Sequence, residues 1–155
     1  MSAIKQFNIL LNKSSLNRFV YWEKYRSELT EYILSNFTNH PHSVLILGCG
    51  NSDDLDLKAF TKKFKNITIS DIDEDALKSA IYKYDLALNN IELVPCDYTG
   101  LNESTLWNNF VNEMLKIDTS KGISSFFNKL NNIVNAFSFT ALNNTYDFII
   151  FSMIY

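Results

Sequence analysis

The chain has 155 residues, and 14 lysines and arginines against 17 aspartates and glutamates give it a formal net charge of −3. Its 46% hydrophobic and 20% charged content excludes a disordered chain, and its acidic balance argues against a protein built to hold a nucleic-acid backbone. No apolar run is long enough to span a membrane, and the N-terminus lacks a signal-peptide pattern. We therefore expect one cytoplasmic domain with reduced cysteines and no metal site.

The first predicted element is a helix near the N-terminus. Apolar residues recur at helical spacing between positions 16 and 37, and Pro41 marks the end of that segment. We expect residues 1–42 to form a helical segment that precedes a single domain at 43–155.

The next element is a strand that leads into a glycine-rich turn. Residues 44–47 are all apolar, as expected of a strand that is buried on both faces in a parallel sheet. The strand stops at the Gly-Cys-Gly sequence of positions 48–50. Ser52 is then expected to cap a following helix, with Asp53 and Asp54 in the first turn of that helix.

The same strand-and-helix unit then repeats along the chain. Residues 67–70 are expected to form a short second strand that Asp71 closes, and Asp73 is expected to cap the helix that follows. A third strand is predicted at 91–94 and a fourth at 148–155. Alternating buried strands and helices predict an open α/β sheet with right-handed crossovers.

Two further helices are predicted between the third and fourth strands. Aromatic and aliphatic residues recur at helical spacing over 103–117 and again over 123–141. Such stripes are typical of helices that pack against a hydrophobic core.

The turn after the first strand is the most informative part of the sequence. A buried strand that runs into Gly48-x-Gly50 and then into a helix lets a ligand approach the backbone closely, because glycine has no side chain. Dinucleotides and S-adenosylmethionine both use such a turn, but the dinucleotide pattern needs a third glycine where Asp53 stands. Asp53 and Asp54 would also oppose a pyrophosphate at the helix N-terminus. S-adenosylmethionine carries no phosphate, so the turn favours it.

Two further carboxylates follow later strands at the same edge of the expected sheet. Asp71 ends the second strand and can accept hydrogen bonds from both hydroxyls of a ribose. Asp97 follows the third strand, where its carboxylate can accept a hydrogen bond from the amino group of adenine. Tyr98 or Ile72 can then lie against the face of the adenine ring. Together with the glycine turn, these features predict a site for S-adenosylmethionine.

The run from 43 to 101 resembles the first half of a class I S-adenosylmethionine-dependent methyltransferase. The segment VLILGCGNS is similar to the glycine-rich first motif of that family, and ITISDIDEDAL is similar to the second, which carries the ribose-binding acid. IELVPCDYTGL resembles the third motif with its adenine-side acid. YDFIIFSMIY resembles the fourth strand, whose end faces the methyl group of the donor. Residues 21–26 (YWEKYR) also resemble a stretch that several of these enzymes place over the cofactor, with a packing helix as the alternative explanation.

The resemblance implies a Rossmann-like fold, with an open and mainly parallel sheet whose first four strands take the order 3-2-1-4. It also implies S-adenosyl-L-methionine as the cofactor. The implied cofactor-binding residues are Gly48, Cys49, Gly50, Asn51, Asp71, Ile72, Asp97, Tyr98 and Ser152. Methyl transfer needs a general base only when the acceptor loses a proton, and no residue is assigned to that role. His40 and His42 precede the first strand, at the wrong edge of the sheet.

The sequence departs from the family pattern in three places. Ile46 stands where the family often has an acid, which weakens the expected hold on the methionine end of the cofactor. Ser52 replaces the third glycine of the first motif. The stretch between Asp97 and Asp147 is longer than usual, so we expect residues 103–142 to be a helical insertion that forms a lid or a substrate wall.

The resemblance implies that a complete enzyme of this family has a seven-stranded sheet, so the domain at 43–155 is expected to be incomplete. The chain would then be a fragment of a longer enzyme, or would self-associate through its exposed fourth strand. We expect a methyltransferase with a small-molecule or protein acceptor, and neither nucleic acid nor a membrane as partner. Two alternatives are an aminopropyltransferase-like enzyme and a non-catalytic or truncated cofactor-binding domain that acts through oligomerisation.

Overall fold

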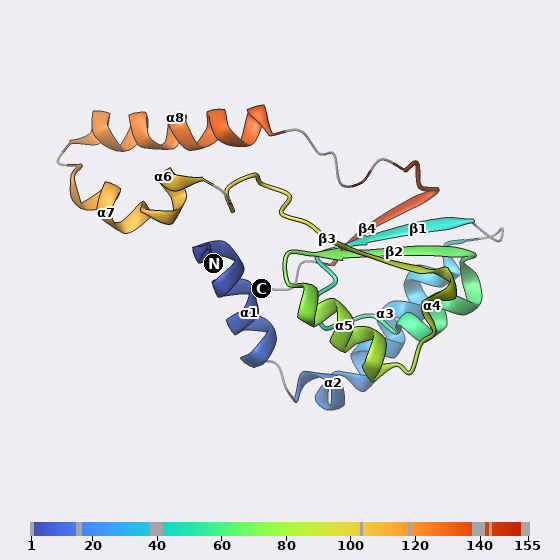
Figure 1. Cartoon of the computed structure of the whole chain (residues 1–155). Coiled ribbons are helices and arrows are strands. Elements are labelled where there is room, and N and C mark those ends of the chain that lie inside the picture. Colours follow the sequence, from blue (N-terminus) through green and yellow to red (C-terminus); the bar gives the residue numbers. More distant parts are fainter. Residues whose placement is uncertain are drawn as a thin grey trace.

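The computed structural model describes residues 2–14, 17–37, 42–102, 104–117, 119–137, 142 and 144–152. The described strands are β1 (Ser43–Leu47), β2 (Asn66–Asp71), β3 (Ile91–Pro95) and β4 (Phe148–Phe151). They form one sheet in the order β3-β2-β1-β4, and all three pairings are parallel (Figure 1). This confirms the predicted Rossmann-like fold and the order 3-2-1-4. β1 is central, and its Ile46 lies beside Ile69 of β2 and Ile150 of β4.

The described helices are α1 (Ala3–Ser14), α2 (Arg18–Tyr21), α3 (Glu23–Ser35), α4 (Leu57–Lys63), α5 (Glu74–Lys83), the 3₁₀ helix η1 (Leu88–Asn90), α6 (Thr105–Asn108), α7 (Phe110–Leu115) and α8 (Ser120–Ala136). Figure 1 shows α3, α4 and α5 together on one side of the sheet. Two right-handed crossovers in the same direction, from β1 to β2 and from β2 to β3, place α4 and α5 on the same side. The chain then reverses direction to reach β4, and α6, α7 and α8 lie beyond the carboxyl ends of the strands.

The hydrophobic core lies between the sheet and helices α4 and α5. Ile46 and Ile69 contribute to it from the sheet, and Phe60 of α4 and Leu77 of α5 pack in the same cluster. All four side chains are completely buried. Burying a large apolar side chain stabilises a fold by about 1.5–3 kcal/mol, so this core fixes the strands whose ends carry the predicted site.

The helix expected directly after the glycine turn begins later than predicted. Ser52 does not cap it: its φ of +50° turns the chain, and its hydroxyl donates to the carbonyl of Leu55 at 2.8 Å. The N-cap is Asp56, whose carboxylate accepts from the amides of Lys58 and Ala59. Residues 51–55 are therefore a loop, and the two aspartates expected in the first helical turn belong to it.

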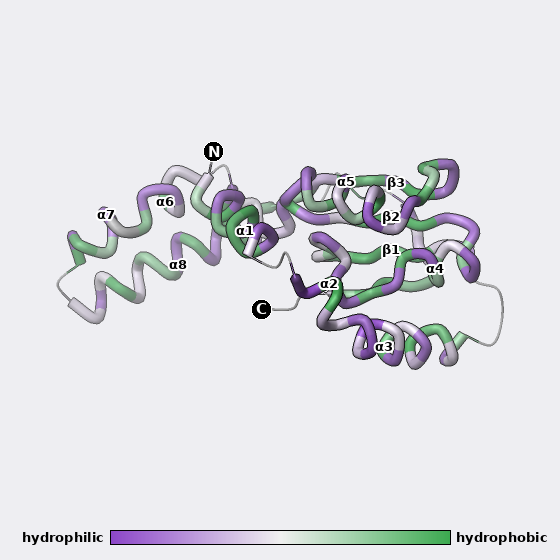
Figure 2. The backbone as a smooth tube through the Cα atoms, turned by 90° about the horizontal axis from the view of Figure 1, so that it is seen from below, coloured by the Kyte–Doolittle hydropathy of each residue, from purple (hydrophilic) through white to green (hydrophobic). Residues whose placement is uncertain are grey.

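The N-terminal segment also differs from its prediction. The helix expected over 16–37 is broken at Trp22 into α2 and α3. The apolar periodicity continues across this break, which is why the sequence shows a single helix. α1, which was not predicted, lies between the sheet and the last three helices (Figures 1 and 2). Leu16, His40 and Pro41 lie outside the described residues.

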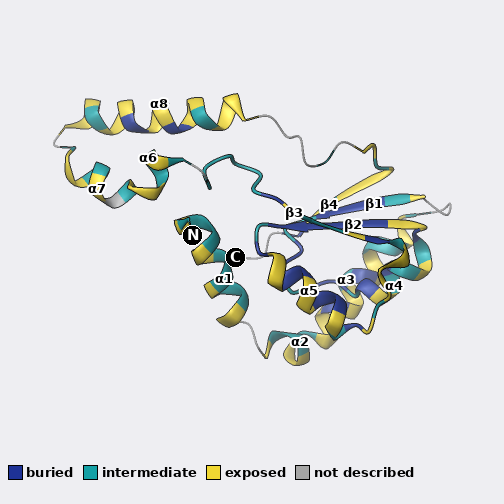
Figure 3. Cartoon of the chain, viewed as in Figure 1, coloured by how far each residue is buried: buried dark blue, intermediate teal, exposed yellow. Residues whose placement is uncertain are grey.

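The two helices predicted between β3 and β4 are present with different boundaries. The first is broken at Asn109 into α6 and α7, and the second begins at Ser120, where Thr119 caps it. We call α6, α7 and α8 the helical arm, which extends away from the sheet and is largely exposed along α8 (Figures 1 and 3). Among the described helices, none combines the length and the apolar character needed to cross a bilayer. The predicted positions outside the described residues are 103, 138–141 and 153–155.

Candidate functional site

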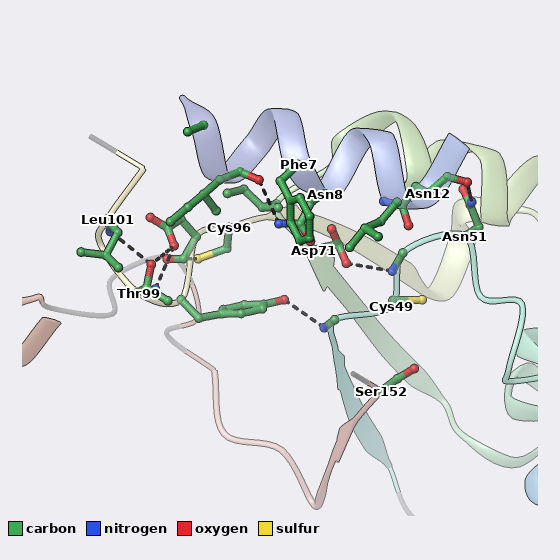
Figure 4. A pocket seen from close by; sticks show the side chains of 18 of the residues that line it. Phe7, Asn8, Asn12, Cys49, Asn51, Asp71, Cys96, Thr99, Leu101 and Ser152 are labelled. Atoms are coloured by element: carbon green, nitrogen blue, oxygen red, sulfur yellow. Dashed lines mark hydrogen bonds between the residues drawn. The ribbon is translucent and has the colours of Figure 1, made fainter. Parts of the chain in front are cut away.

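A cavity of about 700 Å³ lies at the carboxyl ends of the four strands. Its walls come from the segments that follow each strand, from α1 and from the helical arm (Figure 4). Small-molecule sites typically have volumes of about 300–1,000 Å³. Ligands of open parallel sheets bind at this edge, so the cavity is the candidate site.

The turn after β1 forms one wall of the cavity. Gly48 and Gly50 have φ angles of +70° and +48°, a left-handed conformation that glycine adopts without strain. A Cβ atom on Gly50 would lie 2.9 Å from Oδ1 of Asn12, because α1 approaches the bare backbone here. The amide of Gly48 donates to the hydroxyl of Tyr98 at 3.2 Å. The amide of Gly50 donates to Oδ2 of Asp71 at 2.9 Å, so the turn connects the ends of β1, β2 and β3.

Asp71 lies at the end of β2 and is almost completely buried. Its Oδ2 accepts from Gly50 N, and its Oδ1 accepts from Asp73 N at 2.9 Å. Burial raises the pKa of this carboxyl, and the two backbone amides oppose that shift. A carboxylate has about four acceptor positions, so Asp71 keeps room for the hydroxyls of a ribose while its orientation is fixed.

Asp97 shapes the loop that follows β3. Its Oδ1 accepts from the amide of Thr99 at 2.8 Å and from the hydroxyl of Thr99 at 2.7 Å. Its Oδ2 accepts from the amide of Asn102 at 2.7 Å. The neighbouring Tyr98 lines the cavity, and burial raises the pKa of its hydroxyl to about 12. Both residues therefore lie at the site, and their predicted contacts with adenine remain predictions.

Two cationic side chains, the buried Arg26 and the half-buried Lys83, anchor the 51–55 loop. Lys83 of α5 donates to the carbonyl of Asn51 at 3.0 Å and forms an ion pair with Asp53. Arg26 of α3 donates to the carbonyls of Phe19 and Asp53 at 2.7 and 3.1 Å. The two cations lie over the ring of Phe19, at 4.6 Å for the Lys83 ammonium and 4.0 Å for the Arg26 guanidinium. These contacts fix the backbone of the loop that borders the cavity.

The stretch at residues 21–26 contributes both to the cavity wall and to the packing behind it, and its predicted contact with the cofactor stays a prediction. Trp22 lines the cavity, and the guanidinium of Arg18 lies 5.4 Å from the centre of its ring. Arg26, by contrast, is 6% exposed and serves the packing of the 51–55 loop. The segment is therefore partly a cavity wall and partly a structural support.

A second polar contact joins the 51–55 loop to the end of β4. The hydroxyl of Ser152 donates to Oδ2 of Asp54, and the amide of Ser152 donates to the carbonyl of Leu47 at 2.8 Å. Asp54 is 7% exposed and Ser152 is 8% exposed, and both line the cavity. Burial raises the pKa of Asp54, although the hydrogen bond from Ser152 opposes the shift. Sequence reasoning identified Ser152 but assigned no role at the site to Asp54.

α1 closes the cavity opposite the strand ends. Figure 4 shows Phe7 and Asn8 on α1 above the strand ends, where the amide group of Asn8 donates to the carbonyl of Ile4 at 3.0 Å. Asn12 fixes the helix: its amide group donates to Asp73, and its carbonyl accepts from Asn51, both at 2.9 Å. Sequence reasoning missed this wall, although apolar residues at helical spacing were visible in the segment. These residues are Ile4, Phe7 and Leu11.

The helical arm contributes a further wall to the cavity, and the lid or substrate wall expected of residues 103–142 stays a prediction. Trp107 of α6 and Phe110 of α7 line the cavity, and their rings are in contact, with centroids 5.1 Å apart. The arm also contacts α1, because Asn108 accepts a hydrogen bond from the amide of Ala3 at 3.3 Å. The arm and α1 thus close the cavity together.

The structure brings all nine predicted cofactor residues to this one cavity. They are Gly48, Cys49, Gly50, Asn51, Asp71, Ile72, Asp97, Tyr98 and Ser152.

His42 lies before β1, at the opposite end of the strands, where its amide donates to Asp147 at 2.9 Å. Cys49 is buried, and this burial raises the pKa of its thiol, so the thiolate form needed of a nucleophile is disfavoured.

The cavity is strongly acidic. Its described lining contains four carboxylates and a single cationic side chain, that of Arg18. The carboxylates belong to Asp53, Asp54, Asp71 and Asp97. Such a lining attracts a ligand with positive charge and repels one that carries phosphates.

Comparisons with known proteins return methyltransferases among the solved structures. A protein of Bacillus halodurans C-125 assigned as a methyltransferase aligns with a TM-score of 0.39 and 23% identity, over 47% of this chain and 31% of that one. A protein of Methanococcus maripaludis assigned as an S-adenosylmethionine-dependent methyltransferase aligns with a TM-score of 0.44 and 14% identity, over 81% of this chain and 58% of that one. The plantazolicin methyltransferase BpumL, in complex with SAH, aligns with a TM-score of 0.38 and 13% identity, over 90% of this chain and 79% of that one.

The chain spans less than two thirds of the length of the Bacillus and Methanococcus proteins. No protein-family model matches the chain, and no curated protein matches it.

Proposed function

We propose that this chain binds S-adenosyl-L-methionine and transfers its methyl group to an acceptor. The observation that supports this most directly is the charge of the cavity, where four aspartates, of which only Asp53 is paired with a lysine, face one arginine. The sulfonium of S-adenosylmethionine is a cation, whereas the pyrophosphate of a dinucleotide carries two negative charges. The carboxylates therefore favour the first ligand and oppose the second.

The residues present fit such a ligand along the sheet edge. Asp71 would hold the ribose hydroxyls, and the segment after β3, with Asp97 and Tyr98, would hold the adenine. The glycine turn lets the methionine part lie against the backbone, and Arg18 is the available partner for its carboxylate. The cofactor supplies an activated methyl group, so the chain has to hold the acceptor and the methyl carbon in line, roughly 3–3.5 Å apart.

The proposed acceptor is a small molecule or a protein side chain. Trp22, Trp107 and Phe110 give the cavity apolar walls, and its described cations are too few for a nucleic-acid backbone. An aminopropyltransferase would use a decarboxylated form of the same ligand, so that ligand belongs in the binding test.

Calorimetric titration with five ligands tests the proposed function. We expect S-adenosylmethionine and S-adenosylhomocysteine to bind, and NAD⁺ and NADP⁺ not to bind. Decarboxylated S-adenosylmethionine should bind more weakly than the intact ligand, because it has no carboxylate for Arg18. The proposal is wrong if a sample shown to be folded by circular dichroism binds neither S-adenosyl ligand, and tighter binding of the decarboxylated form would favour the aminopropyltransferase.

The Asp71→Asn variant tests the assignment of the ribose site. Replacing the carboxylate by an amide should weaken S-adenosylhomocysteine binding about tenfold or more, because charge-assisted hydrogen bonds to the ribose are lost. The matched control is Asp75→Asn on α5, which makes the same chemical change at an exposed position. Equal affinities of the two variants would contradict the assignment.

A further inference from the structure

Asp54 differs from the other carboxylates that line the cavity. Asp71 accepts on both oxygens, from Gly50 N in the turn after β1 and from Asp73 N, and Asp97 accepts on both oxygens from its own loop. Asp53 is paired with Lys83. The carboxylate of Asp54 accepts from the hydroxyl of Ser152 on Oδ2 and from its own backbone amide, and no further described residue donates to Oδ1. Asp54 is thus a carboxylate, more than nine-tenths buried, that has an open acceptor position and lines the cavity.

The order of the strands places Asp54 at one end of the site. Across the sheet edge, Asp97 follows β3, Asp71 follows β2, the glycine turn follows β1, and Ser152 follows β4. A methyl donor with adenine near β3 and ribose near β2, as proposed above, extends past β1 and directs its reacting end toward β4. The hydrogen bond from Ser152 holds the carboxylate of Asp54 at that end.

We propose that Asp54 is a catalytic residue that binds an ammonium group of the acceptor and removes its proton, so that the acceptor is an amine. The inference rests on the proposed function and identifies the class of its substrate. An ammonium nitrogen has no lone pair and cannot accept a methyl group. One N–H bond breaks and an O–H bond forms on Asp54, the electron pair stays on nitrogen, and the proton later passes from Asp54 to solvent.

The surroundings of Asp54 support this proton transfer. Burial raises the pKa of the carboxyl, which makes it a better base near neutral pH. The positive sulfonium expected beside the acceptor lowers the pKa of the ammonium, because like charges disfavour each other. The ionisable groups that act on Asp54 or respond to it are Asp53, Arg26, the thiol of Cys49 and the hydroxyl of Tyr84. Of these, Arg26 is directed to backbone carbonyls and leaves the carboxylate available.

Sinefungin is a suitable probe, because the acceptor itself is unidentified. In this analogue an amine-bearing carbon replaces the methylsulfonium, so it places an ammonium at the reacting end. S-adenosylhomocysteine is identical in its adenosine and amino-acid parts but has a neutral thioether there. The affinities of both ligands are measured by calorimetry at pH 7.5 for the natural chain, for Asp54→Asn and for the exposed-site control Asp75→Asn.

We expect the natural chain and Asp75→Asn to bind sinefungin about ten- to a hundredfold more tightly than S-adenosylhomocysteine, the range of a charge-assisted hydrogen bond. Asp54→Asn should lose this preference and keep its affinity for S-adenosylhomocysteine within about twofold. Equal weakening of both ligands would place Asp54 at the amino-acid end of the cofactor and overturn the proposal. A preference for sinefungin that survives in Asp54→Asn would overturn it as well.

The same experiment separates this inference from the proposed function. If the natural chain binds neither ligand, the proposed function fails and the role of Asp54 fails with it. If it binds S-adenosylhomocysteine with no preference for sinefungin, the proposed function stands and the inference alone is wrong.

Discussion

Asp54 illustrates the conflict between function and stability at a single residue. In the folded protein its pKa is raised by burial, so the folded state binds the proton more tightly than the unfolded chain. The charged carboxylate therefore lowers the free energy of unfolding at neutral pH. This lost stability is regained as the pH falls through the raised pKa. Buried groups that strain a site in this way are typical where chemistry requires them.

We therefore expect Asp54→Asn to raise the midpoint of thermal unfolding by a few degrees at pH 7. The amide keeps an oxygen for the hydroxyl of Ser152 and removes the buried charge. The gain should vanish at acidic pH, where Asp54 is protonated in the folded natural chain. Differential scanning calorimetry between pH 4 and pH 8 measures the effect, and a variant that is less stable at pH 7 would contradict this account.

At the scale of single elements, α5 supports the 51–55 loop. Lys83, in its last turn, reaches the loop through Asn51 and Asp53. Its side chain is 23% exposed and that of Asp53 is 11% exposed, so the ion pair is only partly screened by solvent. Removal of one partner from such a pair leaves an uncompensated charge beside the cavity.

Lys83→Met should destabilise the fold by about 2 kcal/mol and should weaken cofactor binding. The loss of stability is expected to be smaller than for a fully buried ion pair, because this pair is partly exposed to solvent. Lys78→Met is the matched control on the same helix. Lys78 pairs with Glu74 at the exposed surface, so its loss should leave the free energy of unfolding nearly unchanged. Urea unfolding of both variants measures the difference, and equal losses would show that the Lys83 contact has no special role.

Elements that depend on local pattern could be predicted from the sequence. β1, β2 and β3 appear where the sequence pattern indicated them. Asp73 caps α5 as expected, because the amide of Ala76 that donates to its carboxylate lies only three residues away. The 51–55 loop could not be predicted, because Ser52 resembles an N-cap locally. Its real conformation depends on Tyr84, the C-cap residue of α5, whose hydroxyl donates to the carbonyls of Ser52 and Leu55.

Part of the candidate site could be predicted from the order of the strands. Residues that follow strands meet at one edge of a parallel sheet whatever their distance in sequence, and this rule places Asp71, Asp97 and Ser152 together. It says nothing of α1, which reaches the cavity through side-chain contacts of Asn12. Such contacts depend on packing in three dimensions and have no periodic signal.

At the scale of the whole molecule, β4 is an exposed edge. Ile149 and Phe151 are 53% and 70% exposed, and in register they lie beside Leu45 and Leu47, on the face opposite the core. Among the described residues no strand pairs with the outer edge of β4. Exposed apolar edges of this kind favour association with another chain. We therefore propose that the chain self-associates through β4.

Sedimentation equilibrium tests this self-association. The natural chain should show a concentration-dependent dimer, and the double variant Ile149→Lys/Phe151→Lys should remain monomeric. Leu115→Lys in α7 is the control, because Leu115 is 81% exposed and lies far from β4 along the chain. A monomer at all concentrations, or a dimer that only Leu115→Lys disrupts, would contradict the proposal.

The pairing of β1 with β4 has a consequence for how the molecule opens. Asp147 is hydrogen-bonded to Ser43 from 104 positions away in sequence, whereas β2 and β3 follow β1 closely. Closing so long a loop is entropically unfavourable, and β4 buries few side chains in return. The three strands β1, β2 and β3 therefore form a more persistent unit from which β4 can detach. Detachment would open the Asp54 end of the cavity and leave the ends of β2 and β3 in place, so an acceptor could exchange while the adenosine stays bound.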